Sequence, residues 1–502
     1  MNRHENRKPG KQESRKYRRA GLISCFPVLL FSCFFCTAHA QQSPTRPNFI
    51  VLLVDDWGWR DAGVQVSDLD ETPNIDRFAT TAVRFTDGYA ACTVCSPTRN
   101  ALMTGMYPAR TNCTDWIAGF KPKNPKLRIP DWNMKLDHEH VTIAEALKRD
   151  GYATAHVGKW HLTPPERDKV DAYLPTEHGF DVNIGGNRWG APGSYFYPFK
   201  RGRGNNARAV TPLPEGGKKG DYLTDFLTDH ALKFIENQAK ANKPFYLNFW
   251  YYNVHTPIQG RPDLVEKYKK KLADMPHADR VQHHKNATYA AMVESVDISV
   301  GRILAKLDEL GVADNTVIIL TGDNGGLDRR NNQPTDNHPL REGKGHVYEG
   351  GTRVPLMIRW PNAAKPAVTD TPAMTIDFYP TMLQIAGVRG DPGHNANVDG
   401  TSLVPVLLKP ETQPNRDLFW HYPHYHAGGA TPYGAIRRGD YKLIEFYEGM
   451  SVELYNLKDD LGEKIDLAEQ MPDKIKELRD RLHAWRTRVD AQMPTENVAL
   501  VR

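Results

Sequence analysis

Residues 49–56 read Phe49-Ile50-Val51-Leu52-Leu53-Val54-Asp55-Asp56, six apolar residues followed by two carboxylates. Three later runs have the same form: residues 153–161, 245–255 and 316–324. Near-continuous apolar runs of this length are typical of strands buried on both faces. We therefore predict an α/β fold with a large, mostly parallel or mixed central sheet flanked by helices.

The segments between these runs carry helical signals. Thr142 and Glu145 have capping-box spacing and predict a helix that stops at Gly151. Residues 289–310 have apolar residues at helical spacing and are followed by a glycine. Strands that alternate with helices in this way bring their carboxyl ends to one edge of a sheet, where ligands bind in open α/β folds.

The chain has 502 residues, which suggests two to four domains or one large α/β unit with an appendage. Glycine and proline accumulate between residues 390 and 415. Beyond them come strand-like runs at 435–437 and 441–446 and a helical pattern at 472–489. We predict an N-terminal domain over residues 41–395 and a smaller α+β domain over 396–502, with an antiparallel sheet and a terminal helix.

Residues 1–40 have the pattern of a secretory signal peptide. A basic segment precedes the uncharged stretch 20–38, which closes with the small-x-small sequence Ala38-His39-Ala40. We expect cleavage after Ala40, export to the periplasm or medium, and no stable membrane insertion afterwards. An uncleaved anchor and a lipoprotein box near Cys33 are the alternatives.

The charge of the chain is concentrated in this leader. The formal net charge is +5, but eight of the 65 basic and two of the 60 acidic residues lie in residues 1–40. The remaining 57 basic and 58 acidic residues nearly balance, so the composition argues against a nucleic-acid partner.

Three cysteines follow the leader, at positions 92, 95 and 113, too few for a disulfide framework. Ser96 suits a helix N-cap, Pro97 the first helical position and Gly105 the stop, so we expect Cys95 at a helix N-terminus that favours an anion. Three interpretations of Cys95 are open at this point. It is a small packed residue, one half of a Cys92-x-x-Cys95 redox pair, or a reactive group.

Cys95-Ser96-Pro97-Thr98-Arg99 resembles the signature of the formylglycine-dependent (type I) sulfatases, which belong to the alkaline phosphatase-like superfamily. Further blocks in the order of that family are Asp55-Asp56, Gly158-Lys159-Trp160-His161, His255-Thr256-Pro257, Gly322-Asp323-Asn324-Gly325, residues 343–346 and residues 349–355. The resemblance extends over residues 46–360 and implies the alkaline phosphatase-like fold, with residues 41–395 as the catalytic domain. It also implies a sulfuric ester hydrolase.

The resemblance assigns a nucleophile and its helpers. A maturation enzyme oxidises the family's cysteine to an aldehyde, and one hydroxyl of the hydrated aldehyde attacks sulfur. The other hydroxyl then loses its proton and sulfate is expelled. By the same resemblance, His161 accepts that proton and His255, helped by Lys344, protonates the leaving oxygen. Arg99 supports the nucleophile, while Lys159 and Lys344 neutralise the sulfate.

A metal site is expected beside the nucleophile. Three carboxylates and an amide oxygen suit a hard cation rather than zinc, although Asp-Asp and Asp-Asn-Gly also occur in ordinary turns. The resemblance favours Ca²⁺ over Mg²⁺ and completes the set with the modified residue 95. The expected ligands are Asp55, Asp56, Cys95, Asp323 and Asn324.

The substrate is expected to be a sulfated carbohydrate, a glycosaminoglycan or another sulfated polysaccharide or oligosaccharide. Residues 328–338 are rich in hydrogen-bonding side chains, and residues 420–426 combine histidines with aromatic rings. We expect Asn337, His421 and His424 to contact the sugar. The alternatives are a phosphonate or phosphate ester hydrolase of the same superfamily, an arylsulfatase for small molecules, and a non-catalytic binder of sulfated glycans.

Overall fold

The computed structural model describes residues 46–203, 207–275, 284–328 and 334–498. Residues 45–502 belong to one compact unit. The predicted signal peptide and its cleavage site lie outside the described residues. Within the described residues, no helix is both long enough and apolar enough to cross a membrane.

The centre of the fold is an eight-stranded mixed sheet with the order β12-β2-β11-β10-β1-β9-β5-β6. Five neighbouring strands run parallel, from β10 to β6, and β11 is antiparallel to both β10 and β2. The bounds are β12 (Ala367–Thr369), β2 (Val83–Phe85), β11 (Leu356–Arg359), β10 (Thr316–Gly322), β1 (Asn48–Val54), β9 (Phe245–Trp250), β5 (Ala153–Gly158) and β6 (Val182–Ile184).

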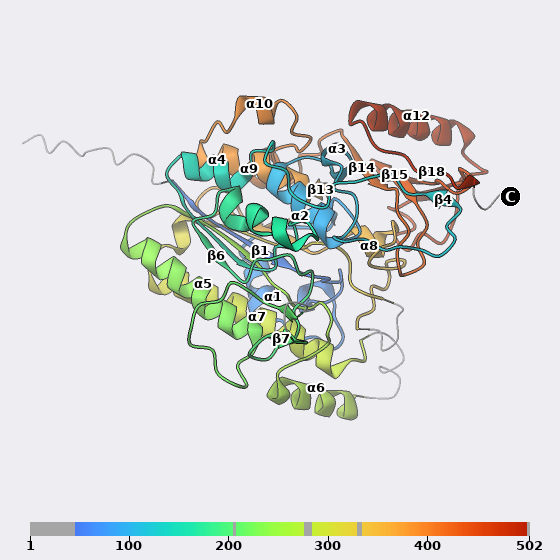
Figure 1. Ribbon diagram of the computed structural model, residues 1–502. Coiled ribbons are helices and arrows are strands. Elements are labelled where there is room, and N and C mark those ends of the chain that lie inside the picture. Colours follow the sequence, from blue (N-terminus) through green and yellow to red (C-terminus); the bar gives the residue numbers. More distant parts are fainter. Residues whose placement is uncertain (1–45, 204–206, 276–283, 329–333, 499–502) are drawn as a thin grey trace, which may run out of the picture. The chain divides into compact units, whose positions relative to one another are not determined.

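Strand β1 lies in the interior of this sheet, and all seven of its residues are buried. Its alternate side chains enter two separate cores: Ile50 and Leu52 one, Val51 and Leu53 the other. The first core contains residues of helices α1 (Pro73–Ala79), α5 (Leu223–Lys240) and α7 (Ala287–Glu309). The second contains residues of α2 (Cys95–Thr104), α4 (Ile143–Arg149), α9 (Phe378–Ala386) and α11 (Val404–Leu408). Figure 1 shows α5 and α7 on one side of the sheet and α4 and α9 on the other. The predicted α/β class is confirmed.

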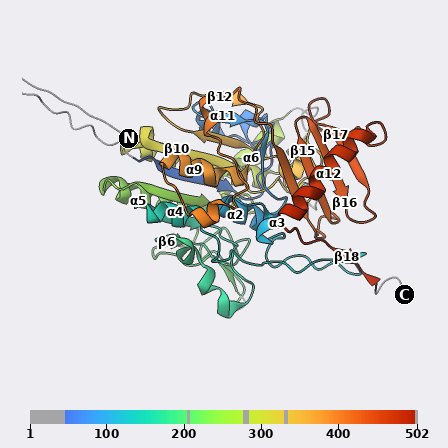
Figure 2. The same ribbon diagram turned by 90° about the horizontal axis from the view of Figure 1, so that it is seen from above.

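A second, four-stranded antiparallel sheet lies near the carboxyl terminus, in the order β14-β15-β16-β17. Its strands are β14 (Asp417–Tyr422), β15 (Tyr433–Arg438), β16 (Tyr441–Phe446) and β17 (Val452–Asn456), and helix α12 (Pro472–Arg488) lies alongside them (Figure 2). Trp485 of α12 stacks on Phe419 of β14 with ring centroids 4.6 Å apart. The expected C-terminal sheet and helix are confirmed, while the domain boundary after residue 395 stays a prediction.

The remaining elements are short connections, apart from α6. They are α3 (Pro108–Thr111), α6 (Pro262–Asp274), α8 (Glu349–Thr352), α10 (Pro392–Asn395) and the strand pairs β3 (Gly88–Tyr89) with β13 (Ala373–Met374), β4 (Leu127–Arg128) with β18 (Thr495–Glu496), and β7 (Lys200–Arg201) with β8 (Arg208–Ala209).

The start of helix α2 differs from the sequence prediction. The helix begins at Cys95 itself, after Val94 in an extended conformation. Ser96, expected as the N-cap, is inside the helix and donates its hydroxyl hydrogen to the carbonyl oxygen of His161 at 2.9 Å. That tertiary hydrogen bond ties the first turn of α2 to the segment after β5, and no side chain of the described residues caps the helix. Gly105 ends the helix in a left-handed conformation, as predicted.

Candidate active site

Five predicted residues come together at the carboxyl ends of three strands from the parallel part of the central sheet, β10, β1 and β5. Asp55 and Asp56 follow β1, Asp323 and Asn324 follow β10, and Lys159 follows β5. The register pairs Val54 with Gly322, so the next residue of each strand, Asp55 and Asp323, begins from the same edge of the sheet. The backbone N–H of Asp56 donates to Asp323 Oδ1 at 3.1 Å.

Cys95 completes this group from helix α2. The sulfur of Cys95 and a carboxylate oxygen from each of Asp55 and Asp323 all lie within 4.8 Å of one another. All three residues are buried. Lys344 Nζ lies 4.0 Å from the sulfur and forms an ion pair with Asp56 Oδ1 at 2.5 Å.

Three cations, Lys159, Arg99 and Lys344, are paired with the carboxylates that follow β1 and β10. Lys159 Nζ contacts both oxygens of Asp55 at 2.9 and 2.7 Å. Arg99 donates to Asp323 Oδ2 from Nε at 2.9 Å and to the carbonyl oxygen of Lys159 at 2.9 Å. The three carboxylates and three cations therefore balance in charge within a buried volume, which is the condition for burying ions at tolerable cost.

The pKa values of the carboxylates diverge according to their neighbours. Burial raises the pKa of Asp55 well above its usual value, against the opposing charge of Lys159. Burial acts in the same direction on Asp56, but Lys344 and His255 reverse it and hold its pKa below the usual range. Burial also raises the pKa of the Cys95 thiol, so the unmodified side chain is a thiol rather than a thiolate at neutral pH.

One polar atom in this group lacks a partner. The amide nitrogen of Asn324 donates to Asp56 Oδ1 at 2.9 Å, whereas its Oδ1 is buried and has no hydrogen-bond partner among the residues that the structure describes. A buried amide oxygen without a donor is unfavourable. A hard cation among Asp55, Asp56, Asp323 and Asn324 would satisfy this oxygen, and these oxygen donors fit a site for Ca²⁺ or Mg²⁺.

Two histidines face the cavity in different tautomeric settings. His161 Nε2 donates to the carbonyl oxygen of Ile117, and its buried Nδ1 has no hydrogen-bond partner in the described part of the chain. His255 Nδ1 donates to the carbonyl oxygen of Thr256 at 2.9 Å, and its Nε2 lies 3.6 Å from Asp56 Oδ2. Burial, with Lys159, lowers the pKa of His161 well below its usual value, and burial, with Lys344, lowers that of His255 to about 3.

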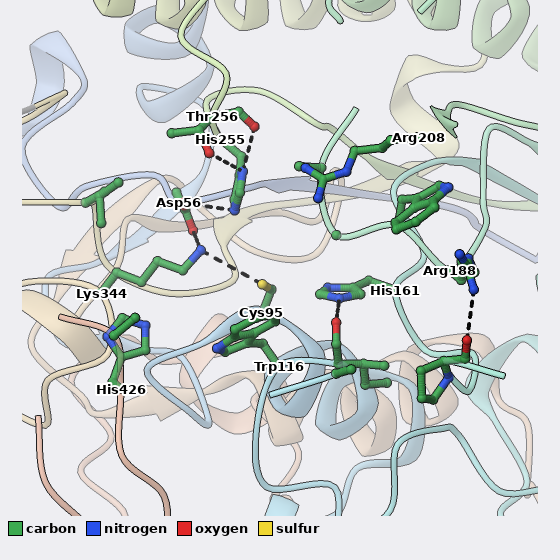
Figure 3. A pocket seen from close by; sticks show the side chains of 18 residues that line it. Asp56, Cys95, Trp116, His161, Arg188, Arg208, His255, Thr256, Lys344 and His426 are labelled. Carbon is green, nitrogen blue, oxygen red and sulfur yellow. Dashed lines mark hydrogen bonds and ion pairs between the residues drawn. The ribbon is translucent and has the colours of Figure 1, made fainter. Parts of the chain in front are cut away.

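These groups open into a cavity of about 450 Å³, within the size range of small-molecule sites. Figure 3 shows Cys95 and Lys344 on one side of it and His161 near its middle. Asp56, Cys95, His161, His255 and Lys344 line the cavity. The other predicted catalytic and metal residues are buried but do not line it: Asp55, Arg99, Lys159, Asp323 and Asn324.

The three expected sugar contacts do not line this cavity. Asn337 donates to the carbonyl oxygens of Gly326 and Glu342, each at 3.1 Å. His421 bonds to Tyr447 Oη at 2.7 Å, and His424 to Thr114 Oγ1 at 2.8 Å. All three side chains are buried in internal contacts. His421 belongs to strand β14, and its ring is held by Tyr447 and the carbonyl oxygen of Gln492.

Other residues line the cavity that sequence reasoning had not assigned to it. They are Trp116, Ile117, Arg188, Trp189, Arg208, Thr256 and His426, among others. Arg188 and Trp189 follow β6, which is parallel to β5. The rule that residues after parallel strands meet at one edge of the sheet would therefore have found this segment, had the short strand β6 been recognised.

Comparison with known proteins gives a consistent result. The model of the sulfatase family matches residues 47–388, and a model described as the C-terminal part of N-sulphoglucosamine sulphohydrolase matches residues 342–488. A protein of Formosa agariphila named Sulfatase is 31% identical over 531 residues, which cover 92% of this chain and 93% of that protein. N-acetylgalactosamine-6-sulfatase of Mus musculus is 31% identical, with 80% and 72% covered.

Solved structures agree in fold. The crystal structure of Ps i-CgsB in complex with k-i-k-neocarrahexaose superimposes with a TM-score of 0.72 at 27% identity and covers 91% of this chain and 96% of that one.

Proposed function

The chain belongs to the sulfatase family and is a sulfuric ester hydrolase, and on that premise we propose that it removes sulfate from a sulfated carbohydrate through a formylglycine at position 95 and a bound Ca²⁺. The observation that carries the proposal is the meeting of the Cys95 sulfur with the oxygens of Asp55 and Asp323 within 4.8 Å. Cations and histidines surround this point, as transfer of an anionic group requires.

Residue 95 is proposed to act in its oxidised form. The buried thiol has a raised pKa, and a thiolate that attacked sulfur would form an adduct with no easy exit. A formylglycine, in its hydrated form, supplies a hydroxyl that attacks sulfur and a second hydroxyl whose deprotonation releases the product. A separate maturation enzyme is the proposed partner that oxidises Cys95.

The metal would be held by Asp55, Asp56, Asp323 and Asn324, with residue 95 beside them. The buried and unpartnered Asn324 Oδ1 supports this set, as does the raised pKa of Asp55. A bound Ca²⁺ would supply Lewis acidity toward an oxygen of the sulfate group. Arg99, locked onto Asp323 at 2.9 Å, holds one of the carboxylates in place.

The two histidines suit opposite proton transfers. His161 carries its hydrogen on Nε2, which bonds to Ile117, so Nδ1 has a free lone pair and acts as the base. His255 presents Nε2 toward Asp56 and Lys344. A sulfate ester bound beside Lys344 offsets the positive charge that lowers the pKa of His255, so His255 gains a proton as substrate binds and acts as the acid.

The cavity supports a carbohydrate substrate. Trp116 and Trp189 line it together with arginine, lysine and histidine side chains, the combination of flat apolar faces and polar groups that a sugar ring needs. One relative is named for N-acetylgalactosamine 6-sulfate, and one structural neighbour was solved with a carrageenan oligosaccharide. Export through residues 1–40 would bring the protein to such substrates.

The decisive experiment measures sulfate release and the mass of residue 95 on the same preparation. Co-expression with a formylglycine-generating enzyme should lower the mass of the Cys95 peptide by about 18 Da relative to the thiol and yield sulfate from a panel of N-acetylgalactosamine 6-sulfate, chondroitin and carrageenan oligosaccharides. Cys95→Ala should abolish release, and Cys113→Ala, at a buried cysteine outside the cavity lining, should retain it. Release by unmodified protein would contradict the proposed nucleophile.

Metal binding has its own readout. Titration of the chelator-treated protein with Ca²⁺ should raise its melting temperature, since a ligand that binds only the folded state stabilises it. Asp323→Asn should lose this response. A response to Mg²⁺ alone, or to neither ion, would contradict the assignment of Ca²⁺.

A further inference from the structure

Beyond the groups proposed for catalysis, Arg188, Trp189 and Arg208 line one part of the cavity and have no role in the proposed reaction. We call this part of the lining the cationic wall. Arg188 and Arg208 both line the cavity, and each approaches the ring of Trp189, with the guanidinium carbon 4.2 and 5.4 Å from the ring centroid. Figure 3 shows Arg188 beyond His161 as seen from Lys344, and the Arg208 guanidinium above His161 and directed toward the cavity.

These guanidinium groups lack acidic partners. Among the described residues, neither Arg188 nor Arg208 forms an ion pair; Arg188 donates to the carbonyl oxygen of Pro165 at 2.8 Å. The charged residue that affects the pKa of Arg188 is another cation: partial burial and the charge of Arg167 both lower that pKa. Arg99, in contrast, lies on Asp323. Positive charge gathered without a carboxylate indicates a site that an external anion completes.

The cationic wall continues on both sides of Trp189. A hollow of about 290 Å³ is lined by Trp189, Arg201 and Arg208, among others. A second, of about 210 Å³, is lined by Trp189, Arg167 and Arg188, with Asp171 as the acidic residue of its lining. Trp189 thus belongs to the catalytic cavity and to both hollows, and arginines exceed carboxylates around it.

The chemistry of this wall matches one class of ligand. A guanidinium group binds sulfate or carboxylate oxygens with paired hydrogen bonds, and an indole face packs against the C–H face of a sugar ring. We propose that Trp189, Arg188 and Arg208 form a second anion subsite, which binds a sulfate ester or a carboxylate of the substrate other than the sulfate that is cleaved. The inference rests on the proposed function and narrows it: the substrate is a glycan that carries at least two anionic groups.

The test compares three disaccharides that share the sulfated sugar that is cleaved: one with a single sulfate, one with a second sulfate on the neighbouring sugar, and one with a uronate as the neighbouring sugar. The wild-type enzyme should favour at least one of the doubly charged substrates in kcat/KM by about tenfold or more, as a charge-assisted hydrogen-bonded pair implies. The favoured arm tells whether the second anion is a sulfate or a carboxylate. Higher ionic strength should reduce the preference.

Substitutions test whether Arg188 and Arg208 cause the preference for doubly charged substrates. The double substitution Arg188→Gln with Arg208→Gln should bring the ratio of kcat/KM values close to one, and Arg208→Glu should invert it. Arg128→Gln, at an exposed arginine of β4 outside the cavity lining, should leave the ratio unchanged. Melting temperatures of all variants identify any that fail to fold; because Arg208 is exposed, its variants are expected to fold.

The outcomes separate the two proposals. If modified wild-type enzyme releases no sulfate from any substrate, the proposed function fails. If it releases sulfate with equal kcat/KM from all three, or if the preference survives the double substitution, the subsite is refuted while the sulfatase assignment stands.

Discussion

Arg99 is fully buried, and its guanidinium connects two segments of the active site. It lies 2.7 Å from Asp323 Oδ2 and also donates to the backbone of Lys159. Arg99→Ala should lower the free energy of unfolding by about 3–5 kcal/mol, because buried carboxylates are left without their cation. Denaturant unfolding measures this loss. Arg77→Ala, at an exposed helix position, is the control, with a change within about 0.5 kcal/mol; equal losses would contradict the role of Arg99.

The roles proposed for His161 and His255 predict how the rate of hydrolysis depends on the leaving group. If His255 protonates the leaving oxygen, His255→Ala should slow hydrolysis of sugar sulfates by about 10²–10⁴-fold and that of aryl sulfates with acidic phenols far less. His161→Ala should slow both substrate types alike, since it acts on residue 95 rather than on the leaving group. Matched kcat values on a sugar sulfate and an aryl sulfate give the answer, and a reversed pattern would exchange the two roles.

The sequence predicted the residues of the site better than those of the substrate cavity. Asp55, Asp323, Lys159 and His255 each follow an apolar strand, and parallel strands bring such residues to one edge. Asn337, His421 and His424 were chosen because polar and aromatic residues suit sugars, a criterion that buried hydrogen-bonded residues also meet. The catalytic and metal roles of the first group of residues, and the substrate role of the second group, stay predictions.

At the scale of elements, strands β1, β5, β9 and β10 and helices α4, α7 and α12 follow their predicted ranges closely. Helix α4 has the predicted capping box between Thr142 and Glu145. Helices α5, α6 and α9 were not predicted, and neither were several strands, which are short or lie at a sheet edge. Strands β2, β6 and β12 have three residues each, too few to show a periodicity, and the histidine and aromatic rings of β14 were interpreted as sugar contacts.

The turn from β5 into the active site depends on a glycine. Gly158 has φ of 102°, and a Cβ there would lie 1.9 Å from the carbonyl oxygen of Trp250 in the neighbouring strand. Gly158→Ala should therefore separate β5 from β9 and displace Lys159 and His161, with loss of activity and a large fall in melting temperature. Gly151 has φ of 88° but no atom within 4 Å of such a Cβ.

Gly151→Ala is the matched control for this prediction. It carries the cost of a left-handed conformation, about 1–2 kcal/mol, without the collision, and should keep its activity. A Gly158→Ala enzyme as active as the Gly151→Ala enzyme would show that the close contact between β5 and β9 is dispensable.

At the scale of the whole molecule, a buried ionic cluster of His284 with three aspartates links stability to pH. His284 Nδ1 lies 2.9 Å from Asp68 Oδ1, and its Nε2 lies 3.2 Å from Asp61 Oδ1; Asp70 faces it at 3.8 Å. Burial alone would lower the pKa of His284, but these carboxylates raise it to about 11. Burial raises the pKa of Asp70 to about 7.

Both shifts stabilise the folded chain at low rather than high pH. The contribution of His284 is complete below its unfolded pKa of about 6.5 and is lost as pH rises toward 11; that of Asp70 is lost by about pH 7. Asp68, whose pKa is lowered to about 2 by His284 against the effect of burial, stays ionised throughout this window. The melting temperature should fall by several degrees from pH 6 to pH 9.5, and His284→Gln should flatten that profile. An unchanged slope in the variant would contradict the assignment.

The burial of Cys95 has a consequence for the order of events during synthesis. The residue is 2% exposed, and its neighbours Cys92 and Val94 share a core with Trp420 and Tyr433 of the C-terminal sheet. A small substrate reaches the sulfur through the cavity, but another enzyme cannot bring its own catalytic centre to the bottom of it. If residue 95 acts as the proposed formylglycine, its oxidation would therefore have to precede the packing of the C-terminal sheet against this core, while the nascent chain is still open. A molecule that finishes folding with its thiol intact would stay inactive for its lifetime.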